Sequence, residues 1–151
     1  MRRSIYVVCT GLVVASVILA GCASGPKTTV TTSNLSALKG TWEGWTDFGI
    51  GQGKPVMTRV EIVNDTVPVT TKITLNNLPS DVARVFPAET KTAGNDVTFE
   101  FKDGRLSDQG TLVARSGKDV LEITYFSGEK PKIKGWFYYW TTKGTFDAQK
   151  R

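Results

Sequence analysis

The strongest constraint on the fold is a repeated alternation of apolar and polar residues in short runs from about residue 38 to the C-terminus. In residues 67–75, for example, Val69, Ile73 and Leu75 share one face with Val67 and Thr71, and threonine and lysine occupy the other. Side chains that alternate with period two point to opposite faces of a β-strand, so each run predicts a strand with one face in water. No stretch has the longer period of an amphipathic helix, and the sequence therefore predicts an all-β fold.

About eight such runs follow one another, at the spacing typical of a sandwich or barrel. The predicted strands are residues 41–48, 56–63, 67–75, 97–102, 110–115, 121–125, 133–141 and 144–148. The predicted turns are residues 49–53, 64–65, 102–104, 116–119 and 127–129, which are rich in Gly, Asn, Asp and Ser. Because no connection is long enough for a crossover helix, we expect a small antiparallel up-and-down β-barrel of about eight strands.

Residues 76–87 depart from the alternation. Ser80 is a good N-cap residue and Pro87 stops a helix, so a short helical turn is expected from Ser80 to Val85. Two placements remain open for this segment. It either covers the open mouth of the barrel or packs as a strand connection against the outer wall.

The first predicted strand carries a recognisable motif. The stretch Leu38-Lys39-Gly40-Thr41-Trp42-Glu43-Gly44 resembles the Gly-x-Trp opening strand of lipocalins and the wider calycin group, including the Gly-Thr-Trp start of avidin-like barrels. The resemblance implies structural roles for Gly40 and Trp42, with Trp42 plugging one end of the barrel. It also implies a basic side chain late in the chain, Lys134 or Lys143, packed across Trp42. It implies no particular ligand.

The N-terminus has the features of an export signal. Arg2 and Arg3 precede an apolar run over residues 5–20, which is shorter than the roughly 20 residues that a bilayer-spanning helix needs. Small residues end the run, and this favours cleavage over an uncleaved N-terminal anchor, which is the alternative.

The stretch Leu19-Ala20-Gly21-Cys22 resembles the lipobox of bacterial lipoproteins. The resemblance implies cleavage before Cys22 and acylation of its thiol, with diacylglycerol and palmitate-type chains that hold the protein in the membrane. In a bacterium with two membranes, Ala23 in place of Asp resembles sorting to the outer membrane, facing the periplasm. We therefore expect a signal peptide over 1–21 and a folded domain over 38–151.

Residues 22–37 lie between these two parts and contain few large apolar side chains. Such a segment buries too little surface to offset the entropy lost on ordering. The sequence therefore predicts an acylated cysteine followed by a flexible tether, with a reach of up to about 50 Å at roughly 3.3 Å per residue.

The composition argues against most catalytic chemistry. The chain has no histidine, Cys9 lies within the signal and Cys22 is expected to be acylated, so triads with His and ordinary zinc sites are excluded. We expect no enzymatic activity, cofactor or metal. An enzymatic alternative requires two carboxylates that meet in a cleft, from the set Glu43, Asp47, Glu61, Glu100 and Glu122.

The charge of the exported part is mild. Removing Arg2 and Arg3 from the 19 Lys and Arg residues leaves 17 against 14 Asp and Glu residues. The basic residues are interspersed with acidic ones and form no stripe that would follow a phosphate backbone, so we expect no nucleic-acid binding.

The most suggestive functional feature is the aromatic run Trp136-Phe137-Tyr138-Tyr139-Trp140. In a strand, Trp136, Tyr138 and Trp140 face one way, and Phe137 and Tyr139 face the other. One set fills the core, and the other either covers neighbouring parts of the barrel or contacts a ligand or partner. Trp45 lies on the strand face opposite to Trp42 and extends this surface if the barrel closes. We therefore predict a ligand-binding or partner surface made of Trp45, Trp136, Tyr138 and Trp140.

Two functional hypotheses follow. In the first, the protein is a lipid-anchored cell-envelope protein that binds a small apolar or amphipathic ligand, or a lipid, through its barrel. In the second, it is a periplasmic interaction module, such as an envelope assembly factor or an enzyme inhibitor, with a barrel filled by side chains. The volume of the interior discriminates between them.

Overall fold

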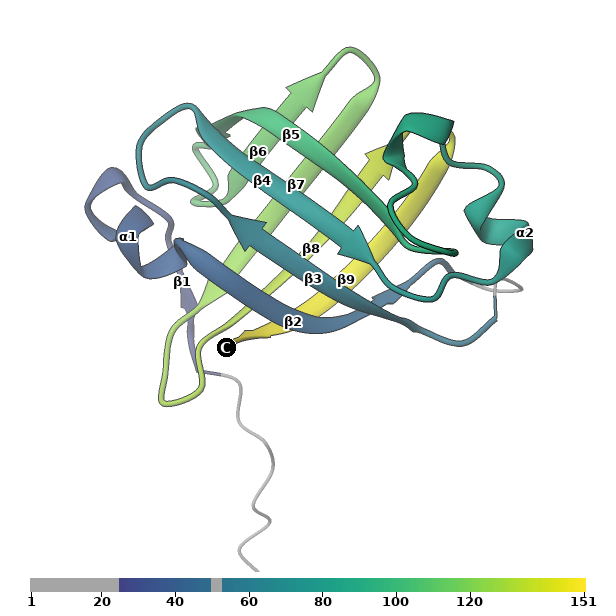
Figure 1. The fold of residues 1–151 in the computed structure, drawn as a ribbon. Helices are drawn as coiled ribbons and strands as arrows, with labels where there is room; N and C mark the ends of the chain where they lie inside the picture. Colours follow the sequence, from purple (N-terminus) through teal and green to yellow (C-terminus); the bar gives the residue numbers. More distant parts are fainter. Residues whose placement is uncertain (1–24, 50–52) are drawn as a thin grey trace, which may run out of the picture.

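The chain folds as a closed barrel of eight antiparallel strands, with one short strand outside it (Figure 1). The computed structural model describes residues 25–49 and 53–151. The barrel strands are β2 (Gly40–Asp47), β3 (Val56–Ile62), β4 (Val69–Leu75), β5 (Val97–Leu106), β6 (Leu112–Ser116), β7 (Asp119–Phe126), β8 (Lys132–Tyr139) and β9 (Thr142–Lys150). Each pairs with the next, and β9 pairs back with β2. The prediction of a small antiparallel up-and-down barrel is confirmed.

Side chains fill the interior at both ends of the barrel. Near one end, the ring of Phe99 on β5 lies 5.2 Å from that of Phe137 and 4.2 Å from that of Tyr139, both on β8. Near the other end, the rings of Trp42 on β2 and Tyr125 on β7 are 6.2 Å apart. Because neither β5 and β8 nor β2 and β7 are neighbours in the sheet, these rings meet across the lumen.

Trp42 closes the end of the barrel that carries the C-terminus. Its side chain is fully buried, and its indole Nε1 donates a hydrogen bond to the carbonyl oxygen of Leu38 at 2.8 Å. Lys150 Nζ lies 5.3 Å from the centre of the Trp42 ring and donates to the carbonyl oxygen of Ala37 at 2.6 Å.

The prediction that Lys134 or Lys143 packs across Trp42 is therefore wrong, because Lys150 occupies that position. Lys134 instead pairs with Asp147 at 3.2 Å, and Lys143 lies over the ring of Trp136. The reason is that β9 runs two residues further than predicted, to Lys150, which is the register partner of Trp42 on β2.

Residues 25–37, before the barrel, are ordered and packed, so the prediction of a flexible tether is wrong for this part of 22–37; residues 22–24 lie outside the described residues. The short strand β1 (Lys27–Thr28) pairs with β7, and a 3-10 turn, η1 (Thr32–Asn34), leads into the single helical turn α1 (Leu35–Leu38). Val30, Leu35 and Leu38 are buried in the core. The described chain is therefore part of the fold from its first residues, and Val30, Leu35 and Leu38 tie it to the barrel core.

The connection between β4 and β5 covers the opposite end of the barrel. It contains the single helical turn α2 (Ser80–Ala83) and the 3-10 turn η2 (Ala88–Thr90). Phe86 is buried and stacks on Phe99 at 5.8 Å and on Tyr139 at 6.5 Å, so the segment closes the mouth of the barrel. The expected cap is wrong: Pro79 occupies the N-cap position and Ser80 is already helical.

The predicted turn over residues 102–104 is also absent. These residues belong to β5, which continues to Leu106. Between Val69 and Thr71 the register with β5 shifts, because Val69 pairs with Gly104 whereas Thr71 pairs with Phe101. A β-bulge accommodates the polar residues Lys102 and Asp103 within the strand.

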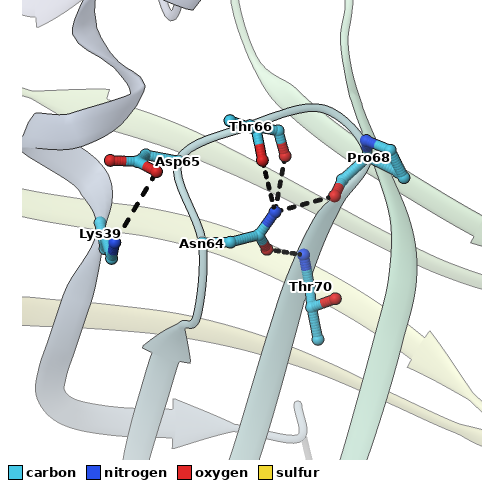
Figure 2. A network of polar contacts seen from close by, with 6 residues as sticks. All are labelled: Lys39, Asn64, Asp65, Thr66, Pro68 and Thr70. Carbon is cyan, nitrogen blue, oxygen red and sulfur yellow. Dashed lines mark hydrogen bonds and ion pairs between the residues drawn. The ribbon is translucent and has the colours of Figure 1, made fainter.

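The hairpin between β3 and β4 is ordered by one side chain, as Figure 2 shows. Asn64 Nδ2 donates to the carbonyl oxygens of Thr66 at 2.6 Å and Pro68 at 3.0 Å, and Asn64 Oδ1 accepts from the amide of Thr70 at 2.7 Å. Lys39 Nζ lies 3.7 Å from a carboxylate oxygen of Asp65 and links the hairpin to the end of α1. In the described part of the chain, no helix is long and apolar enough to cross a bilayer.

The packing of the N-terminal segment can be tested with Leu35→Ala. Because Leu35 is only 1% exposed, we expect the free energy of unfolding to fall by about 2 to 5 kcal/mol, measured by urea denaturation. Ser36→Ala is the control, since Ser36 is exposed on the same turn and its loss is expected to change stability by less than about 0.5 kcal/mol. Equal stability of the two variants would show that this segment does not contribute to the core.

Candidate functional site

The four aromatic residues predicted to form a surface lie in three different places. Trp136 and Tyr138 point outward from β8 and are half-buried, whereas Trp45 points outward from β2. The strand β9 separates β2 from β8. From strand and residue spacing, the Cα atoms of Trp45 and Trp136 are about 12 Å apart. Trp140 lies beyond the end of β8, in the turn to β9.

Trp136 is held by its neighbours on the barrel wall. Its Nε1 donates a hydrogen bond to Glu122 Oε2 at 3.2 Å, and Lys143 Nζ lies 5.7 Å from its ring centre. The opposite face of the same strand is core, since Phe137 is fully buried and Tyr139 packs against the core. Much of the aromatic run thus stabilises the barrel itself.

Trp45 is exposed and has an exposed apolar neighbour. It stands directly opposite Met57 in the pairing of β2 with β3, and the two side chains are 56% and 54% exposed. Large apolar side chains exposed next to each other mark sites of interaction more often than isolated ones.

Open grooves lie on both sides of Trp45. The groove toward β3 has a volume of about 490 Å³ and the groove toward β9 about 360 Å³. The first is lined by Trp45, Lys54, Pro55, Val56, Met57, Asn76, Asn77 and Pro79. We call the exposed apolar part of this region, Trp45, Pro55, Met57 and Pro79, the Trp45 surface.

Sequence reasoning missed the contribution of Met57 to this surface. The alternation of residues 56–63 is enough to place Met57 outward, between the buried Val56 and Thr58. Its position opposite Trp45 follows only from the register of two strands, which the sequence does not state.

A third, more enclosed hollow lies at the α2 end of the barrel. It has a volume of about 260 Å³ and lies between α2 and the start of β9. Its lining residues are Phe48, Asp81, Val82, Val85, Thr141, Thr142 and Lys143. Nearby in the turn, Trp140 is 59% exposed.

Trp140 adopts an unfavourable backbone conformation. Its φ is +58°, and a bulky side chain is rarely found there. The amide of Trp140 donates a hydrogen bond to Asp119 Oδ1 at 2.9 Å, which ties the turn to the start of β7. Strain of this kind persists where the surrounding structure imposes it and is concentrated at functional sites.

The strain at Trp140 can be measured. We expect Trp140→Asn to raise the free energy of unfolding by about 0.5 to 1 kcal/mol, because Asn tolerates a positive φ better than Trp. The control is Thr141→Asn at the neighbouring turn position, for which no gain is expected. A loss of stability in Trp140→Asn would mean that packing of the indole outweighs the backbone strain.

The environment of Tyr139 in the barrel changes the pKa of its hydroxyl group. Burial raises the pKa of Tyr139 above its ordinary value of 10.0, and the nearby carboxylates of Asp119 and Glu89 raise the pKa further. Between the unfolded and the folded pKa, the unfolded chain has lost this proton while the folded protein retains it. The free energy of unfolding therefore falls as the pH rises above 10.0.

The variant Tyr139→Phe tests this linkage. We expect the wild type to lose more stability than Tyr139→Phe between about pH 9 and pH 11, because the variant lacks the titrating hydroxyl. Urea denaturation at a series of pH values measures the difference. Parallel pH profiles for the two proteins would contradict the assignment to Tyr139.

Two of the carboxylates considered for catalysis, Glu43 and Glu100, pair with different basic residues. Glu43 accepts hydrogen bonds from Arg59 at 3.2 Å and Arg151 at 3.1 Å. Glu100 pairs with Lys72 at 3.4 Å and Lys102 at 3.7 Å. Within residues 25–49 and 53–151, no cluster of three or more His, Cys, Asp or Glu side chains could hold a metal ion.

The two structural residues of the Gly-x-Trp motif lie at the start of β2. Gly40 has a φ of +123°, a backbone conformation that residues with a side chain rarely adopt. This conformation favours glycine where the chain turns from α1 into β2. The expected lipid attachment residue, Cys22, lies outside the described residues.

Comparisons with protein-family models, with curated proteins and with solved structures found no match to this chain.

Proposed function

We propose that the protein is a lipid-anchored interaction module of the cell envelope that binds a partner protein on its outer wall, at the Trp45 surface. The observation that carries this proposal is the pair Trp45 and Met57, directly opposite each other and both more than half exposed. The anchor is the acylated Cys22 implied by the lipobox, in the outer membrane facing the periplasm.

The filled interior favours this function over the binding of a ligand inside the barrel. Phe86, Phe99, Phe137 and Tyr139 contact one another within the α2 end, with ring centres between 4.2 and 6.5 Å apart. A ligand in this space would have to displace buried aromatic side chains, whose removal from a core costs several kcal/mol each.

The chemistry of the Trp45 surface fits a protein partner. Tryptophan is among the residues most enriched in binding hot spots, and the flexible thioether of methionine adapts to different surfaces. Polar groups flank these apolar side chains: Asn76 and Asn77 line one groove, and Asp47 and Asp147 line the other. An apolar centre with a polar rim is the usual anatomy of a protein interface.

Photocrosslinking in intact cells tests this proposal. A photoreactive phenylalanine analogue replaces Met57 in one variant and Arg115 in the control, since Arg115 is exposed on β6, on the other side of the barrel. We expect one discrete protein adduct from position 57 and none from position 115. Adding Trp45→Ala is expected to reduce the adduct at least about tenfold, the loss typical of a hot-spot residue.

Two outcomes would overturn the proposal. One is the absence of a discrete adduct from position 57. The other is an adduct that Trp45→Ala leaves unchanged. The amount of protein in the envelope fraction, measured for every variant, separates lost binding from lost folding.

A further inference from the structure

The structure determines which end of the barrel lies next to the expected lipid anchor. The strand β1 pairs Lys27 with Phe126 and Thr28 with Tyr125, at the end of β7. Thr28 Oγ1 also donates a hydrogen bond to Ser127 Oγ at 2.7 Å. The described chain therefore begins beside the loop between β7 and β8, at the end of the barrel that also carries α1 and the C-terminus (Figure 1).

The distance from there to Cys22 is limited by covalent geometry. Cys22 precedes Gly25 by three residues. At no more than about 3.6 Å per residue, their Cα atoms are at most about 11 Å apart. A strand of eight residues such as β2 spans about 26 Å before tilt, so the α2 end lies beyond this reach.

We propose that the end of the barrel formed by α1, the β7–β8 loop and the C-terminus rests on the surface of the membrane that holds the lipid anchor. The α2 end, with Trp140 and the hollow beside α2, then faces away from the membrane. This inference rests on the acylation of Cys22 in the proposed function. In this orientation the barrel lies directly against the membrane, and not at the end of a tether with a reach of about 50 Å.

The charge of this end suits the phosphates of lipid headgroups. Five exposed basic residues lie at this end, against the acidic residues Asp108 and Glu129 and the carboxylates of Asp65 and Glu43, which pair with Lys39 and Arg151. The basic residues are Lys27, Lys39, Lys130, Lys150 and Arg151. Each Lys or Arg close to an anionic membrane surface contributes about 1 kcal/mol of attraction. Because the connection to the lipid is short, it holds these residues close to the membrane surface and so raises their effective concentration there.

Apolar side chains are exposed at the same end. Val63 and Val67, in the hairpin between β3 and β4, are 39% and 41% exposed. The bonds of Asn64 hold this hairpin in one conformation, and Lys39 lies beside it (Figure 2). A rigid hairpin with two valines and a neighbouring lysine suits the boundary between headgroups and acyl chains.

Energy transfer from the full-length lipidated protein to labelled lipids tests the orientation. The protein is reconstituted into vesicles of phosphatidylethanolamine and phosphatidylglycerol that contain an acceptor-labelled lipid. A donor dye is attached to a cysteine introduced at Glu129, in the β7–β8 loop, or at Lys118, in the turn between β6 and β7. Both residues are exposed, and the antiparallel strand order puts the β6–β7 turn with Lys118 at the same end as the β4–β5 connection that contains α2.

We expect transfer from position 129 to be about twice that from position 118, because the two positions differ in height by most of the barrel length. A matched variant with a long Gly/Ser insertion between Ser24 and Gly25 is expected to bring the two values closer together. The double variant Lys27→Glu, Lys130→Glu is expected to reduce the difference at low salt.

The outcomes separate the orientation from the proposed function. Equal transfer from the two positions, or stronger transfer from position 118, in vesicle-bound protein overturns the orientation and leaves the anchor intact. Protein that carries no acyl chain at Cys22 by mass spectrometry overturns the anchor and, with it, the orientation. Neither result bears on the partner detected by crosslinking at position 57.

Discussion

The pairing of the last strand with the first, with Trp42 at their junction, is the contact on which the rest of the structure depends. Without the pairing of β9 with β2, the sheet would have two open edges and its core would be exposed at the seam. Trp42 lies at this seam. Its ring is covered by Lys150 from the last strand, and its indole nitrogen bonds to the carbonyl of Leu38 in α1. One side chain thus joins the N-terminal segment, the first strand and the end of the chain.

Closure of a small barrel around many aromatic rings requires space, and glycines on the last two strands provide it. Gly135 on β8 stands opposite Phe146 on β9, and Phe137 on β8 stands opposite Gly144 on β9. A Cβ at Gly135 would lie 2.4 Å from Phe146 Cζ, and a Cβ at Gly144 would lie 2.6 Å from Phe137 Cζ. Each phenylalanine ring therefore occupies the space that a side chain on the neighbouring strand would take. The same packing fills the interior of the barrel with side chains.

The two ends of the barrel differ in chemistry. The end closed by Trp42 combines the beginning of the described chain, the C-terminus and more exposed basic than exposed acidic residues. The end closed by Phe86 combines the hollow beside α2 with the strained, exposed Trp140. In the proposed orientation, the second end and the side wall with Trp45 face away from the membrane.

Much of this architecture follows from local patterns in the sequence. The period of two determined the all-β class and approximately where most strands lie, and it predicted that Trp42 and Trp45 face opposite sides, because side-chain direction in a strand is a local property. The lipobox and Gly-x-Trp resemblances likewise rest on a few consecutive residues, so they can be recognised without knowledge of the fold. Only the tertiary structure decided that Lys150 covers Trp42, that residues 25–37 pack against the barrel, that residues 102–104 form a bulge, and that Met57 stands beside Trp45. Each of these depends on the register between strands distant in sequence, and register is determined by the closure of the whole sheet and the packing of its interior.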